Sequence, residues 1–84
     1  MHKPRRSPKW SPNIIRTLKP IRVDGTQEIR VNVIKEKGDL YLDIREFLNS
    51  DRFHGYTTRG LFLSAEEWDA LIAQRKKISK LLAP

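Results

Sequence analysis

The chain has 84 residues, of which 38% are apolar, and a net charge of +7. This length predicts one small domain with a modest core, which a second copy often completes. The composition excludes several classes of protein. No apolar run approaches the roughly 18 residues of a spanning helix, no apolar segment follows Arg5 and Arg6 as in an export signal, and the lack of cysteine excludes disulfides and thiolate metal sites.

The excess positive charge lies in the first 22 residues. These hold seven basic residues and no acidic one, whereas the remaining 62 hold ten of each. Proline recurs in this segment, at Pro4, Pro8, Pro12 and Pro20. Because proline removes amide donors and fixes φ, regular structure is not expected here. We predict a flexible, basic, proline-rich arm over residues 1–18, which either engages nucleic acid or only solubilises the chain. Trp10 would pack on the domain or stack on a base.

The folded domain is predicted over residues 19–84 and begins with strands. The expected strands cover residues 21–23, 28–35, 39–47 and 60–63. Asp24–Gly25 and Gly38 mark two turns between them, since these residues favour the positive φ of tight hairpins. The polar stretch 49–59 is predicted to be a loop.

The last predicted element is one helix over residues 65–82. Ser64 and Glu67 have the spacing of a capping box, and Leu63 and Trp68 that of a hydrophobic staple. Acidic residues gather at its start and basic ones at its end, an order that complements the helix dipole. Its apolar stripe exceeds what one small sheet can cover, which favours dimerisation through the helix. The predicted dimer interface consists of Trp68, Leu71, Ile78, Leu81 and Leu82.

The predicted architecture is α+β: a four-stranded, curved antiparallel sheet followed by one C-terminal helix (ββββα), as a homodimer. A single helix covers one sheet face and leaves the other open to solvent. Alternation along residues 39–47 directs Leu40, Leu42 and Ile44 towards the helix. Tyr41, Asp43 and Arg45 would then face outward, together with Arg30, Asn32 and Arg22.

Arginines beside an aromatic ring suit single-stranded nucleic acid, because unpaired bases stack on flat side chains while cations track the phosphates. The alternative is an ordinary solvated face with cross-strand pairs such as Arg30 with Asp43. Catalysis is not expected. His54 is a lone loop histidine, and Asp43 and Glu46 have opposite parity, so they would not share a metal ion. We predict no enzyme activity, no metal and no cofactor.

Two stretches, "KGDLYLDIREF" from Lys37 and "RGLFLSAEEWDAL" from Arg59, resemble the transcriptional coactivator positive cofactor four family, including its bacterial and phage relatives. The resemblance covers about residues 21–82. It implies the ββββα fold, a homodimer joined through its helices, and a pair of β-ridges that bind single-stranded or melted DNA with little sequence preference. By the same resemblance, Arg45, Lys37 and Arg59 match DNA-contacting basic residues.

Three positions depart from the family pattern. Glu36 and Leu48 stand where relatives carry aromatic residues, and Asp39 stands where a relative has a lysine. Tyr41, Phe53 and Tyr56 are predicted to replace the missing stacking surfaces. The complete predicted DNA-binding set is Arg22, Arg30, Asn32, Lys37, Tyr41, Arg45, Phe53, Tyr56 and Arg59.

The function predicted from all this is binding of single-stranded DNA without sequence specificity, in transcription, replication or repair. One alternative is an RNA-binding regulator that uses the same face. Another is a transcription cofactor that binds only proteins, through its loop and arm. Expected partners are single-stranded DNA and a second copy, with RNA and transcription or replication proteins as further candidates and no membrane. The expected location is nuclear in a eukaryote, and cytoplasmic with the nucleoid in a bacterium or its phage.

Overall fold

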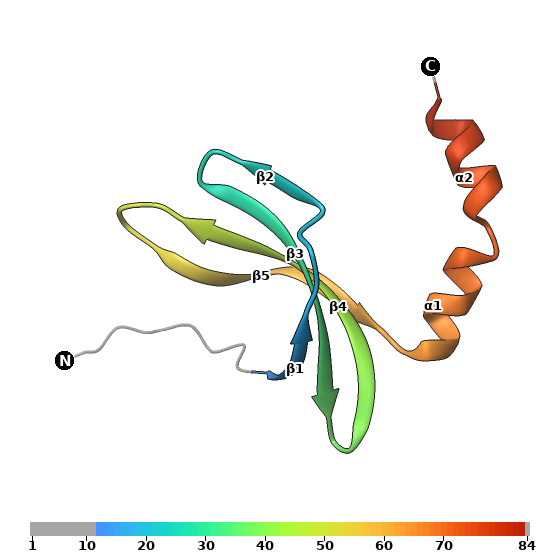
Figure 1. Ribbon diagram of the computed structural model, residues 1–84, viewed down its shortest axis with the longest axis horizontal. Helices are drawn as coiled ribbons and strands as arrows, with labels where there is room; N and C mark the ends of the chain where they lie inside the picture. The colour runs from blue at the N-terminus through green and yellow to red at the C-terminus, as the bar shows by residue number, and fades with distance from the viewer. Residues whose placement is uncertain (1–11, 84) are drawn as a thin grey trace.

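The computed structural model describes residues 12–83, so the predicted roles of Trp10 and of the first eleven residues lie outside it. Five strands precede two helices in the order β1 (Asn13–Thr17), β2 (Arg22–Asp24), β3 (Gln27–Glu36), β4 (Asp39–Asn49), β5 (His54–Leu63), α1 (Ala65–Ile72) and α2 (Arg75–Leu82) (Figure 1). The predicted α+β class, with an antiparallel sheet and a C-terminal helical segment, is confirmed.

The sheet has the order β1-β3-β4-β5, and the short β2 also pairs with β3. All pairs are antiparallel, and β3 and β4 keep an unbroken register from Gln27–Leu48 to Glu36–Asp39. Gly25 and Gly38 adopt φ values of 62° and 88° in the turns that close two hairpins. Both predicted turns are therefore confirmed, for the expected reason that glycine takes positive φ without a Cβ clash.

Strand β1 corrects the prediction of irregular structure for residues 13–17 of the predicted arm. Its pairing with β3 sets Ile14 opposite Ile34, with an irregularity before Arg16. Pro12 and Pro20 flank the strand without entering it. Within residues 12–20 the proline argument therefore holds at Pro12 and Pro20 themselves, and the apolar residues between them are free to extend the sheet.

The predicted loop over residues 49–59 is also wrong. The chain turns within residues 50–53, where the Ser50 amide donates to the Phe53 carbonyl at 2.8 Å, and β5 begins at His54. The first half of this strand is polar because the strand lies at the edge of the sheet, where one side faces water. Its sequence therefore lacks the apolar alternation that would have predicted a strand. Its Thr57 and Thr58 are β-branched and fit an extended backbone well.

The predicted single helix divides into α1 and α2. The capping box at its start is confirmed: Ser64 Oγ accepts from the Glu67 amide at 3.1 Å, and the Glu67 carboxylate accepts from the Ser64 amide at 2.8 Å. The break comes after Ala73, where the Gln74 amide donates to the Leu71 carbonyl in a tighter, 3₁₀-like bond. Arg75, Lys76 and Lys77 thus begin a second helix instead of ending the first, so they oppose its dipole, whereas Lys80 in its last turn complements it.

The two faces of the sheet differ in burial, and the buried face is the one that the sequence predicted to be open to solvent. We call the side that carries Asn32, Asp43 and Arg45 the polar face, and the side that carries Leu40, Leu42, Ile44 and Leu61 the apolar face. On the polar face Asn32 and Asp43 are 0% exposed, and Arg45 is 5% exposed. On the apolar face Leu40 is 57% and Leu61 53% exposed. The predicted alternation is right, but the predicted open face is the buried one.

The physical reason lies in the curved sheet and in the direction of the helices. Side chains and backbone from β5 close over the middle of β3 and β4 on the polar face, through contacts of Tyr56 and Thr57. Helix α1 packs against β4 and β5 near the point where β5 leads into the helix. Helix α2 extends away from the sheet (Figure 1). Within one chain, much of the apolar face therefore stays uncovered.

Candidate nucleic-acid interface

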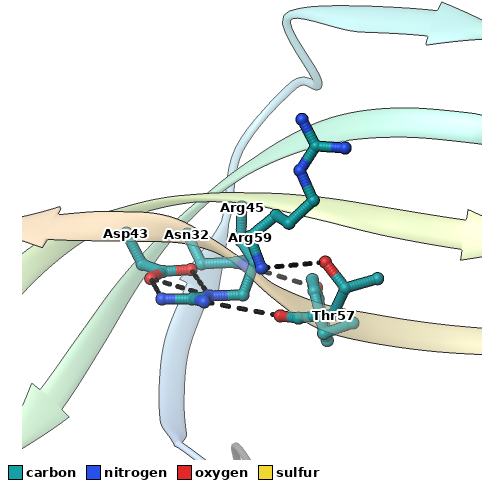
Figure 2. Close-up of polar contacts among 6 residues, drawn as sticks. Asn32, Asp43, Arg45, Thr57 and Arg59 are labelled. Atoms are coloured by element: carbon teal, nitrogen blue, oxygen red, sulfur yellow. Dashed lines mark hydrogen bonds and ion pairs between the residues drawn. The ribbon is translucent and has the colours of Figure 1, made fainter.

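An ion pair between Asp43 and Arg45 lies at the centre of the polar face. The two residues are two positions apart on β4, so their side chains project to the same side. Arg45 Nη2 lies 3.0 Å from Asp43 Oδ1, and Nη1 donates to the Thr57 carbonyl at 3.4 Å (Figure 2). Burial raises the pKa of Asp43, and the hydrogen bond from Arg45 opposes that rise. Asp43 therefore holds a neighbouring arginine of its own strand in place.

Asn32 lies beside this pair and is also enclosed. Its Nδ2 donates to the Tyr56 hydroxyl at 3.1 Å, while its buried Oδ1 makes no hydrogen bond with residues 12–83. The expectation that Asn32 and Arg45 stand on an open, DNA-facing surface is therefore wrong. A strand of DNA cannot reach side chains that are 0% and 5% exposed in the folded chain.

An aromatic cluster next to the pair is more accessible. Arg30 Cζ lies 3.5 Å from the centre of the Phe47 ring and 5.7 Å from that of Tyr56. Phe47 meets the rings of Tyr56 and His54 edge to face, at centroid distances of 5.0 and 5.2 Å. We call Arg30, Phe47, His54 and Tyr56 the aromatic cluster. Its Arg30 is half-buried and keeps one flat guanidinium surface stacked on Phe47.

Glu28 holds Arg30 in this position. Its carboxylate lies 2.8 Å from Arg30 Nε, and this hydrogen bond is the main cause of a raised Arg30 pKa. Arg30 therefore pairs with an acid on its own strand. The cross-strand pair of Arg30 with Asp43, weighed from the sequence, is not formed.

The hairpin tips hold two further predicted residues. Lys37 is exposed with a φ of 51°, an uncommon backbone conformation outside glycine, at the β3–β4 tip. Phe53 is 42% exposed at the β4–β5 tip, beside exposed Arg52. Tyr41 is half-buried, and its ring packs edge-on against Phe62 at 5.0 Å. The two tips point in different directions (Figure 1), so they do not form one continuous strip within the chain.

Arg22 and Arg59 lie on the other side of the sheet. They line a hollow of about 260 Å³ with Gln27 and Glu46. The Arg59 side chain is well exposed and extends away from the Asp43–Arg45 pair (Figure 2), with Nη1 3.8 Å from Glu46 Oε2. The alternation of the sequence did not place these two arginines on a different face from the other predicted DNA-binding residues. The strands predicted around them, residues 21–23 and 60–63, were too short to set their register.

Glu46 forms a polar network that sequence reasoning missed. Its carboxylate accepts from Gln27 Nε2 at 2.6 Å and from Thr57 Oγ1 at 2.9 Å. These hydrogen bonds lower the pKa of Glu46, the one from Gln27 most. The contribution of Phe47 and His54 to the aromatic cluster was missed as well. The period-2 pattern continues through Phe47, so the pattern itself contained that signal.

Residues 12–83 contain neither a candidate metal-binding cluster nor a helix suited to crossing a membrane. No three histidine or acidic side chains there are grouped so as to hold a metal ion. In the same part of the chain, neither helix has the length and apolar character that crossing a membrane requires.

The curved antiparallel sheet, with its arginine and aromatic side chains and its helical C-terminus, defines a small α+β domain with a candidate nucleic-acid-binding surface. The family model described as Transcriptional Coactivator p15 (PC4) matches residues 23–74, more than half of the chain. The chain therefore belongs to the transcriptional coactivator p15 (PC4) family, whose members are DNA-binding transcription coactivators, and the predicted resemblance is confirmed. No curated protein and no solved structure matches the chain. The matched segment runs from β2 to the end of α1 and omits both β1 and α2.

Proposed function

We propose that this protein acts as a homodimeric transcription coactivator that binds single-stranded or locally melted DNA without reading its sequence. Family membership supports DNA binding and coactivation in general. The observation that carries the single-strand mechanism is the aromatic cluster, in which the Arg30 guanidinium is stacked 3.5 Å above Phe47 beside Tyr56. We propose a binding role and no catalytic one, with a nuclear location in a eukaryotic cell.

The aromatic cluster has the chemistry that unpaired bases require. Each base presents a flat face, and stacking on an aromatic ring or an arginine plane contributes about 1–3 kcal/mol without sequence preference. Tyr56 and Phe53 lie near each other along the β4–β5 hairpin, and the Phe53 ring approaches Gly55. We propose that bases stack on Arg30, Tyr56 and Phe53, in place of the aromatic residues that the family has at positions 36 and 48.

Cations around this surface would contact the phosphates. Lys37 and Arg52 are exposed at the two tips, and Arg59 is exposed on the opposite face. A dimer presents each of these twice, so cations that lie apart in one chain can flank one bound strand. We assign Arg45 a structural role, because its guanidinium is engaged by Asp43 and Thr57.

The dimer is supported by the uncovered apolar surface. Ile34 and Phe47 are the buried hydrophobic residues of the described chain, while Leu40, Leu61 and most apolar residues of both helices remain exposed. So small a core does not suffice for a stable domain of this size. We propose that a second copy covers the apolar face and the helices, through Trp68, Leu71, Ile78, Leu81 and Leu82.

The deciding experiment is a titration of the full chain with matched single-stranded DNA, duplex DNA and RNA at two salt concentrations. We expect single-stranded DNA to bind more tightly than duplex, with log affinity falling by about 0.7 per log salt for each phosphate contact. Equal affinity for RNA would favour the regulator of RNA instead. No binding of any oligonucleotide at physiological salt would favour the protein-binding cofactor and refute the proposal.

A further inference from the structure

Helix α2 carries a concentrated positive charge. Four of its eight residues are basic, namely Arg75, Lys76, Lys77 and Lys80, and none is acidic. Helix α1 has the opposite character, with Glu66, Glu67 and Asp69 and no base. None of the four cations forms an ion pair with any residue from 12 to 83. The acidic residues of this chain therefore do not neutralise α2.

Three of these four cations are placed unfavourably for the helix, and only Lys80 lies in its last turn, where positive charge is favourable. Arg75, Lys76 and Lys77 occupy its first turn, where the helix dipole favours negative charge. Gln74, at the N-cap position, makes no side-chain capping hydrogen bond either. Helix stability alone would favour acidic residues here, as in the first turn of α1. An anion from outside the chain, bound at this first turn, would neutralise the repulsion between these cations and the helix dipole.

The helix separates its charge from its apolar stripe. Lys76 and Lys80 are four residues apart, so they project from the same side. Ile78, Leu81 and Leu82 occupy the other side. A second copy that covers the apolar stripe would thus leave Lys76 and Lys80 in solvent. The helix also extends away from the sheet (Figure 1), so these cations are remote from the aromatic cluster.

We propose that α2 is a second DNA-binding element, which holds backbone phosphates independently of the sheet. The helix has no aromatic residue and a single arginine, Arg75, so charge is its main means of recognition. Duplex DNA, with its dense phosphates, is therefore a suitable ligand for it. Together, the two elements would let the protein hold a melted strand on the sheet and the adjoining duplex on α2. Helix α2 lies outside the segment that the family model matches, so family membership does not assign it this role.

The test compares two full-length variants that each remove two positive charges. One is Lys76→Gln with Lys80→Gln on α2, and the other is Lys19→Gln with Lys35→Gln, both exposed positions outside the helices. The probe is a short blunt duplex, titrated over a range of salt concentrations. We expect the salt dependence of log affinity to become shallower by about 0.9 for each phosphate that the α2 variant no longer neutralises. The control variant should keep the wild-type slope.

Three results would overturn the proposal. An equal reduction of the slope in both variants would mean that net charge alone attracts the duplex. An unchanged slope in the α2 variant would mean that α2 does not contact DNA. Dissociation of the dimer in the α2 variant would identify the acidic α1 of a second copy as the occupant. Single-strand binding in the same variants tests the sheet separately, so failure of one site is distinguishable from failure of the other.

Discussion

The guanidinium of Arg45 lies 3.0 Å from the carboxylate of Asp43, and both side chains are enclosed by the curved sheet. Removing one partner of a buried ion pair leaves an uncompensated charge, which typically costs about 3–5 kcal/mol. We expect Asp43→Leu to lose stability on this scale in urea unfolding. The double variant Asp43→Leu with Arg45→Met should be more stable than Asp43→Leu alone, because neither charge then remains buried. A double variant that is less stable than the single one would contradict this account.

Gly60 allows β5 to approach β4 closely. A Cβ atom at this position would lie 2.5 Å from the Ile44 carbonyl oxygen and 2.8 Å from Arg45 Cα. Both contacts are with backbone, so the strand itself would have to move. We expect Gly60→Ala to cost about 1–3 kcal/mol in thermal or urea unfolding. Thr58→Ala, at another position of the same strand, is the control and should change stability by less than about 0.5 kcal/mol.

Glu46 should make stability depend on acidic pH. Its pKa in the fold is lowered from the ordinary 4.5, chiefly by the hydrogen bond from Gln27. The ionised form is therefore the one that the fold stabilises, and its contribution is present above pH 4.5 and disappears as pH falls through the folded value. We expect the stability advantage of the wild type over Glu46→Gln to shrink below pH 4.5.

The raised pKa of Asp43 has the opposite effect on the pH dependence of stability, because the contribution of Asp43 to the free energy of unfolding increases as pH falls. Both proteins in the Glu46 comparison retain Asp43, so its contribution cancels from the difference. Urea unfolding at a series of pH values measures the effect. Parallel curves for the wild type and Glu46→Gln would show that the network around Glu46 does not affect its ionisation.

Two substitutions at Tyr56 distinguish base stacking on its ring from the hydrogen bond of its hydroxyl. If a base stacks on its ring, Tyr56→Ala should weaken single-strand binding by about 1–3 kcal/mol. Tyr56→Phe keeps the ring and removes only the hydroxyl that accepts from Asn32. We expect Tyr56→Phe to bind single strands like the wild type, although it is less stable. Phe53→Ala and Tyr41→Ala extend the series, and unchanged affinity in all three alanine variants would refute stacking on these rings.

Leu71 tests the proposed dimer. It lies with Trp68 on one side of α1, whereas its neighbour Ala70 projects from the other side. A charge buried against a partner's apolar surface is costly. We therefore expect Leu71→Asp to shift the protein towards monomer in sedimentation equilibrium, while Ala70→Asp remains dimeric. A wild-type chain that is monomeric at micromolar concentrations would refute the dimer.

Local features of the sequence predicted the local features of the fold. The alternation of residues 39–47, the glycine turns and the Ser64–Glu67 capping box are each set by a few neighbouring residues, and all are present. The segments that were missed lack such signals. Strands β1 and the first half of β5 are polar or flanked by proline, and no glycine or proline marks the break at Ala73–Gln74.

The sequence by itself determined which side chains share a face of β3 and β4, because the period of a strand is fixed by its backbone. Only the tertiary structure decided which face is buried. The curvature of the sheet encloses Asn32, Asp43 and Arg45, while the helices leave much of the apolar face uncovered. Burial depends on what lies opposite a face, and that is set by long-range pairing and by the direction of α1 and α2. For this reason Arg45, the strongest DNA-binding candidate from its pattern, is buried in the folded chain, and the more accessible arginine is Arg30 of the aromatic cluster.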